Sequence, residues 1–154
     1  MRQIHVVTIA VLFIGCVTGE VAVPNTAGEK KIISSTSAPK AIGPYSQAVM
    51  VGNTVYLAGQ IPIDPQTNQV VQGTIEEQTR LVMENLRAVL TAAGMDFKNV
   101  VLAQCFLKDL ADFPKFNEVY GTYFTDGKPP ARATVQVARL PRDVAVEVAL
   151  IAVK

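Results

Sequence analysis

The sequence has little of the chemistry on which most metal-dependent and nucleophile-dependent enzymes rely. Its 154 residues include a single histidine, His5, close to the start of the chain. Because residues 1–19 are predicted to form a cleaved leader, the mature chain would contain no histidine. This absence excludes a histidine-based zinc site and the Ser-His and Cys-His nucleophile systems.

Cysteine is also scarce. Cys16 falls in the predicted leader, and Cys105 lies in an apolar run at 100–107. Without the leader, Cys105 has no intrachain partner, so an internal disulfide is excluded. We interpret Cys105 as a buried small hydrophobic residue rather than a reactive thiol.

Positively and negatively charged residues are nearly equal in number. Fourteen Lys and Arg residues against 13 Asp and Glu residues give a formal net charge of +1. There is no basic run, no interleaving of aromatic and basic residues and no acidic tail. Nucleic acid is therefore not expected as a partner.

Residues 1–19 have the pattern of a secretory signal peptide. A short basic start, Met1-Arg2, precedes an apolar run at 6–17 that is too short to span a membrane comfortably. Val17-Thr18-Gly19 has the small-residue character of a signal-peptidase site. We therefore predict an exported protein, either periplasmic or secreted.

A second interpretation of the leader stays open. Phe13-Ile14-Gly15-Cys16 resembles a bacterial lipoprotein box, in which Cys16 would carry the lipid anchor, although Phe13 is a poor match to the first position. Without such lipidation, no membrane association is expected. After the leader, residues 20–31 read as a flexible polar tether, and 32–154 as the folded domain.

The domain, roughly 125 to 135 residues after the leader, is long enough for one core. Its pattern predicts an α+β sandwich of about six strands, with two helices on one face. The strands are expected at 31–34, 47–51, 54–60, 100–107, 131–137 and 146–153. The first helix should begin at the capping box Thr74 and Glu77 and end at Gly94; the second should begin at Asp112 and be terminated by Gly127 and Pro129-Pro130. The uncovered sheet face favours oligomerisation.

Two charged residues interrupt the C-terminal strands. Arg132 shares a strand face with Thr134 and Gln136, whereas Glu147 shares one with Ala149 and apolar residues. A carboxylate near apolar surface is costly unless something pairs with it or uses it. Isolated charges in strands are also typical of solvent-facing edges and ordinary ion pairs. The two strand sequences alone do not distinguish these structural roles from a role in a functional site.

Four sequence motifs, taken together, indicate a specific family. They are Ala41-Ile42-Gly43-Pro44-Tyr45-Ser46-Gln47-Ala48, Ala58-Gly59-Gln60-Ile61-Pro62-Ile63-Asp64-Pro65, Pro130-Ala131-Arg132-Ala133-Thr134, and Leu140-Pro141 before Val146-Glu147-Val148. In their order and separations they resemble the RidA/YjgF family of reactive-intermediate deaminases, from about Ser35 to Val153.

The resemblance implies a chorismate-mutase-like fold assembled as a homotrimer, with active sites in the clefts between subunits. It implies hydrolysis of 2-imino acids and their enamines, such as 2-iminopropanoate and 2-iminobutanoate, to 2-oxo acids and ammonia. It implies no metal and no organic cofactor. The substrate would then be a small carboxylate with a C=N group.

The resemblance also assigns roles to residues. Arg132 matches the carboxylate-binding arginine, whose planar fork gives two parallel donors. Glu147 matches the acid that handles the attacking water and returns a proton to the leaving nitrogen. Tyr45 matches a cleft-lining tyrosine, the Gly59 region would offer backbone amides, and Asn117 matches a polar residue near the pocket. Alone, Tyr45 also fits a turn, Gly59 a strand bulge and Asn117 a solvated helix face.

The chain departs from many relatives at three positions. It has Ala58 in place of Ser, Thr134 in place of Cys and Ala149 in place of a second Glu. Thr134 keeps a hydroxyl and stays a candidate substrate-binding residue, whereas Ala58 removes a possible hydrogen bond from the pocket wall. Two other functions remain open: a non-catalytic trimer that binds small carboxylates, and a holdase-like trimer that needs neither charged residue.

Overall fold

The structure is a computed structural model that describes residues 28–154. The predicted leader and most of the predicted tether, including Cys16, lie outside the described residues. The last residue of that tether, Lys31, is the first residue of strand β1. None of the helices in the described part of the chain combines the length and the hydropathy needed to cross a bilayer.

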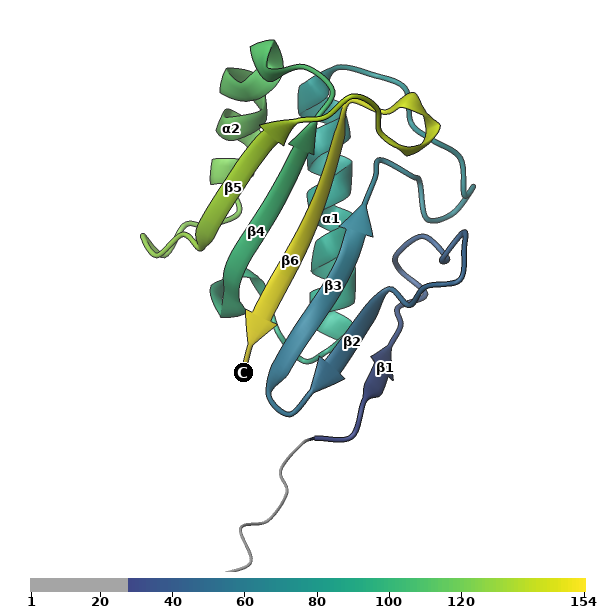
Figure 1. Ribbon diagram of the computed structural model, residues 1–154, viewed down its shortest axis with the longest axis vertical. Helices are drawn as coiled ribbons and strands as arrows, with labels where there is room; N and C mark the ends of the chain where they lie inside the picture. Colours follow the sequence, from purple (N-terminus) through teal and green to yellow (C-terminus); the bar gives the residue numbers. More distant parts are fainter. Residues whose placement is uncertain (1–27) are drawn as a thin grey trace, which may run out of the picture.

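Six strands form one mixed sheet, and two α-helices cover one of its faces (Figure 1). The strand order is β1-β2-β3-β6-β4-β5, in which only β4 and β5 run parallel. The elements in chain order are β1 (Lys31–Ile33), β2 (Ala48–Val51), β3 (Thr54–Gln60), α1 (Ile75–Ala92), β4 (Val100–Leu107), α2 (Phe113–Gly121), β5 (Ala131–Gln136) and β6 (Val146–Val153). The predicted α+β architecture is confirmed.

Helix α1 begins and ends where local sequence signals place it. Thr74 Oγ1 accepts a hydrogen bond from the Glu77 amide at 3.3 Å, and Glu77 Oε2 accepts one from the Thr74 amide at 2.8 Å. These two bonds satisfy amides that would otherwise lack partners in the first helical turn. After the helix, Gly94 adopts a φ of +70°, which costs glycine little. The apolar face of α1 is fully buried at Val82, Leu86, Val89 and Leu90.

Helix α2 starts directly after Asp112, as predicted, but it lacks the predicted cap bond and ends earlier than predicted. Asp112 makes no side-chain cap hydrogen bond. Asp109 instead accepts from the Ala111 amide at 2.9 Å and starts a 3₁₀ turn, Leu110–Asp112, that leads directly into α2. Because Asp112 already has helical backbone angles, it does not cap the helix. The helix ends at Gly121, so Gly127 and the two prolines shape the following loop rather than the helix terminus.

The main core lies between the sheet and the helices. On β6, Val146, Val148, Leu150 and Ala152 point toward the helices and are almost completely buried. Each aliphatic side chain buried in this way contributes on the order of 1.5–3 kcal/mol relative to an exposed one. A smaller apolar cluster of Ile61, Ile63, Leu140 and Val144 forms near Phe106, under the loops that follow β3 and β5.

The other face of the sheet is apolar and open. The strand register aligns one residue from each strand into a row across this face. The row consists of Ile32, Val49, Tyr56, Ile151, Leu102 and Ala131. Ile32 and Tyr56 are about half exposed, at 51% and 49%. Hydrophobic surface of this extent is typical of an interface.

Candidate functional site

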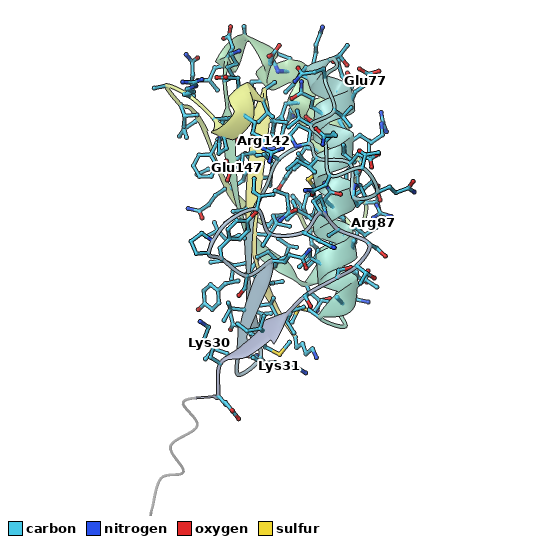
Figure 2. All side chains as sticks on the ribbon, turned by 90° about the vertical axis from the view of Figure 1, so that its right-hand side faces the viewer. Lys30, Lys31, Glu77, Arg87, Arg142 and Glu147 are labelled. Carbon is cyan, nitrogen blue, oxygen red and sulfur yellow. The ribbon has the colours of Figure 1, made fainter. Side chains whose placement is uncertain are left out.

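Glu147 is a partly buried carboxylate near the start of β6. Strand alternation turns Val146 and Val148 toward the helices, so Glu147 points to the open face, opposite Phe106 on β4. In Figure 2 it lies in the half of the molecule away from Lys30 and Lys31. Burial raises the pKa of Glu147 above the usual 4.5. Within residues 28–154 it forms no salt bridge, so its charge is left for a ligand or a water to use.

A hollow of about 240 Å³ is lined in part by Glu147. Its lining is mostly apolar and comes from the loop before β2, the end of β3 and the turn before β6. The lining residues are Ile42, Tyr45, Ala58, Gly59, Ile61, Pro141 and Glu147. The sequence prediction of a carboxylate beside apolar surface is confirmed. Ala58 lies in the wall of this hollow, where a serine hydroxyl would otherwise offer a hydrogen bond.

Gly59 makes space for Glu147. It lies in a strand irregularity between Leu57 and Gln60, where the register of β3 against β6 shifts. A Cβ atom on Gly59 would collide with Glu147 Oε1 and lie 2.9 Å from Glu147 Cδ. The bulge therefore brings bare backbone against the carboxylate. The steric role is visible in the contacts, whereas donation by backbone amides of this region stays a prediction.

Tyr45 lies on an exposed loop at the rim of the same hollow. Its hydroxyl accepts a hydrogen bond from the Ile42 amide at 3.3 Å, and its ring is 46% exposed. The loop is held from behind by the buried Gln47 carboxamide, which accepts from the Ser35 amide at 2.6 Å and donates to the Pro39 carbonyl at 2.7 Å. Tyr45 and Glu147 are thus brought together from positions about a hundred residues apart.

Arg132 occupies the edge strand β5 and points toward α2. Its guanidinium carbon lies 4.7 Å from the ring centre of Tyr120, 5.5 Å from that of Phe113 and 6.0 Å from that of Phe116. No Asp or Glu in residues 28–154 lies within 4.0 Å of it as an ion-pair partner. The positive charge is therefore stabilised by aromatic faces rather than by an acid.

A second hollow, of about 440 Å³, opens beside Arg132. It lies between α2 and the segment before β5 and is lined by Asn117, Tyr120, Gly121, Phe124, Pro129, Pro130 and Arg132. Asn117 is thus close to Arg132. Thr134 shares the Arg132 face, and its hydroxyl is buried.

Cys105 is the strand neighbour of Thr134. It is 1% exposed, and burial raises the pKa of its thiol to about 11, despite the opposing effect of Arg132. The thiol is therefore protonated near neutral pH, which confirms that Cys105 is a buried small residue.

Arg132 and Glu147 point to opposite faces of the sheet. Arg132 is paired with Ala103, and Ala103 is paired with Leu150, which faces the helices. Glu147 lies an odd number of residues from Leu150 on the same strand, so it faces the other way. No residue lines both hollows. The chain therefore carries two separate candidate clusters, which we call half-sites, one with Arg132 and Asn117 and the other with Glu147, Tyr45 and Gly59.

Sequence reasoning missed the aromatic residues around Arg132. Phe113, Phe116 and Tyr120 follow one another at helical spacing on α2, a pattern that is more often ordinary core. The helical spacing of the three aromatic residues can be read from the sequence. The position of Arg132 over their rings cannot be predicted from it. No group of three or more His, Cys, Asp or Glu side chains placed to hold a metal ion occurs in the described chain.

Comparison with known proteins gives a consistent set of relatives. Residues 35–154 match the family model described as Endoribonuclease L-PSP. A RutC family protein of Saccharolobus solfataricus is 58% identical over 125 residues, which cover 81% of this chain and 98% of that protein. The mouse 2-iminobutanoate/2-iminopropanoate deaminase is 50% identical over 81% of this chain and 92% of its own. The crystal structure of RidA from an Antarctic Psychrobacter species has a TM-score of 0.77 at 43% identity, covering 80% of this chain and 99% of that one.

Proposed function

Since this chain belongs to the RidA/YjgF family, which the Endoribonuclease L-PSP model represents, we propose that it hydrolyses 2-imino acids to 2-oxo acids and ammonia. The observation that carries the proposal is a pair of ionisable side chains without ion-pair partners in residues 28–154. Arg132 and Glu147 each open onto a hollow. Unpaired and partly buried charges are expensive, and they are typical of sites where a ligand completes the pairing.

In the proposed reaction, Arg132 binds the substrate carboxylate. Its guanidinium gives two parallel N–H donors to one carboxylate and fixes the distance from the imine carbon to the other half-site. Asn117 and Thr134 lie on the same side of the sheet and would supply further hydrogen bonds. Tyr45, which is exposed at the rim of the Glu147 hollow, would cover the substrate from that side.

Glu147 would handle the protons. Its carboxylate takes a proton from water while the water oxygen bonds to the carbon of the protonated imine, whose C=N π electrons pass to the nitrogen, giving an aminoalcohol. Glu147 then gives that proton to the amino nitrogen, the C–N bond breaks with release of ammonia, and the hydroxyl passes its proton back to Glu147 as it becomes the carbonyl of the 2-oxo acid. One positioned acid–base group typically gives about 10² to 10⁴ in rate, which suffices for an imine that already hydrolyses in water.

The two half-sites require more than one subunit. Arg132 and Glu147 of one chain face opposite sides of the sheet. A small substrate therefore cannot contact both side chains of the same chain. We propose a homotrimer in which the apolar open faces pack together and Arg132 of one subunit meets Glu147 of the next. This arrangement would also cover Ile32 and Tyr56, which are half exposed in one chain.

Ribonuclease chemistry, which the family description names, has less support in this chain. The described residues contain no histidine to act as acid and base on a phosphodiester, and the sequence has no basic run to hold a phosphate backbone. The apolar lining around Glu147 suits a small alkyl group better than a nucleotide.

A coupled assay tests the proposed function. An amino-acid oxidase generates 2-iminopropanoate or 2-iminobutanoate, and loss of the imine is followed with the wild type and with Arg132→Ala. We expect faster loss with the wild type and near-buffer rates with Arg132→Ala, while Arg80→Ala, an exposed arginine on α1, stays as fast as wild type. Equal rates with wild type and Arg132→Ala, or no rate above buffer, would end the proposal.

Binding separates an enzyme from a carrier or a holdase. Glu147→Gln should abolish turnover and still bind the product 2-oxobutanoate, which can be followed by calorimetry. A carrier of small carboxylates would show binding that depends on Arg132 but no turnover in the wild type. A holdase would show no carboxylate-specific binding at all.

A further inference from the structure

Three aromatic rings of α2 form a shelf under the Arg132 guanidinium. Phe113, Phe116 and Tyr120 recur at helical spacing, and all three ring centres lie within 6.0 Å of the guanidinium carbon. Tyr120 is the nearest, at 4.7 Å. We use the term aromatic shelf for these three residues.

The aromatic shelf is anchored in the core. Phe116 is completely buried and Tyr120 is 4% exposed, and their ring centres are 5.5 Å apart. Tyr120 also packs against Phe124 at 4.8 Å. Rings packed in this way cannot turn freely, so they offer the guanidinium a fixed surface.

The surroundings of Arg132 are otherwise neutral. Its neighbours Thr134 and Cys105 carry no charge, and no acceptor within residues 28–154 receives a hydrogen bond from the guanidinium. Aromatic faces attract a cation without using its N–H groups. An acid in the place of the shelf would occupy those donors and compete with a bound carboxylate.

We propose that Phe113, Phe116 and Tyr120 are positioning residues that hold the Arg132 guanidinium in place with its N–H edge free for a substrate carboxylate. This inference rests on the proposed function, in which Arg132 binds that carboxylate. The shelf would replace the acidic partner that usually orients a binding-site arginine. It would act on substrate affinity, because the carboxylate does not change charge or position during hydrolysis.

Phe113 offers the clearest test, because it is only partly buried and can be changed with little effect on the core. Phe113→Leu should raise KM roughly three- to tenfold, with kcat within about twofold of wild type. It should weaken 2-oxobutanoate binding by the same factor. Phe113→Tyr, which keeps the ring, should restore both values.

Testing Phe113→Leu in a protein that lacks Arg132 separates a positioning role from general damage to the fold. Because Arg132→Ala turnover is expected near the buffer rate, this comparison uses binding: in the Arg132→Ala protein, Phe113→Leu should not weaken 2-oxobutanoate binding further, because the shelf acts only through the arginine. An unchanged KM in Phe113→Leu, or the same loss in both backgrounds, would overturn the inference.

Failure of the shelf inference can be distinguished from failure of the proposed function. If the wild type shows no turnover, the deaminase proposal fails, and the shelf is still tested by Arg132-dependent binding of 2-oxobutanoate. Equal affinity of wild type and Phe113→Leu, or affinity that Arg132→Ala does not change, would then overturn it. If the wild type is active and Phe113→Leu matches it in every parameter, only the shelf inference fails.

Discussion

The two charged residues of the candidate site, Arg132 and Glu147, have different surroundings. Arg132 lies over aromatic rings, whereas Glu147 lies against the bare backbone at Gly59 in a mostly apolar hollow. Neither arrangement neutralises the charge. Both leave the reactive group facing a space, and this is what a site for a small charged substrate requires.

The pH dependence of turnover should follow Glu147. Because burial raises the pKa of this carboxyl above 4.5, it takes up a proton at a higher pH than an exposed glutamate. A base must be ionised, so kcat/KM should fall as the pH is lowered through that raised pKa. A pH profile checks this, with the exposed Glu118→Gln as a control that keeps the wild-type curve. Full activity down to the ordinary glutamate pKa would contradict the assigned role.

Gly59→Ala should damage the site without unfolding the protein. The new Cβ collides with the Glu147 carboxylate, which must move away from its position over the bulge. A displacement of about 1 Å can cost on the order of 10²-fold in rate, so a loss of that size in kcat is expected. Turnover and thermal denaturation would be measured together. A variant with wild-type kcat would show that the carboxylate position does not matter.

The residues of each half-site could be predicted, but their relative placement could not. Alternation within β5 and β6 shows which residues share a face on each strand. It does not fix the phase between the two strands, because β4 lies between them and a crossover helix sets the register. The opposite orientation of Arg132 and Glu147 therefore appears only in the assembled sheet.

Whole elements follow local signals to different degrees. In α1 the capping box, the apolar stripe and Gly94 agree, so both its ends were predicted correctly. In α2 the predicted Asp112 holds the N-cap position without a side-chain cap bond, because Asp109 starts a 3₁₀ turn that leads into the helix. Turn residues at 127–130 were too far downstream to mark its end. Boundaries are predictable where several signals coincide and unreliable where one stands alone.

Thr74→Ala should weaken α1 and leave the site intact. It removes the hydroxyl that accepts the Glu77 amide, and the loss of such a cap typically costs about 1 kcal/mol. Urea denaturation would show the change in the free energy of unfolding, while KM should stay the same. The control is Thr91→Ala on the exposed side of the same helix, which is expected to be neutral or slightly stabilising. Equal stability of wild type and Thr74→Ala would contradict the capping role.

At the scale of the whole molecule, the proposed trimer depends on the open face of the sheet. Tyr56→Lys places a charge in the middle of the apolar row that we expect to be buried between subunits. A buried unpaired charge costs several kcal/mol, so the trimer should dissociate and turnover should fall with it. Sedimentation would report the mass, with Thr91→Lys on the outer side of α1 as the control. An active Tyr56→Lys monomer would disprove the shared site.

Mixed assembly of two inactive variants tests the central claim most directly. Arg132→Ala and Glu147→Gln are each expected to be inactive alone, because every site lacks one of its two charged groups. When equal amounts are unfolded and refolded together, three quarters of the trimers should be mixed, and each mixed trimer should contain one complete site. Turnover should then return to about one quarter of the wild-type value. A co-refolded mixture as inactive as its two components would contradict a site shared between neighbouring subunits.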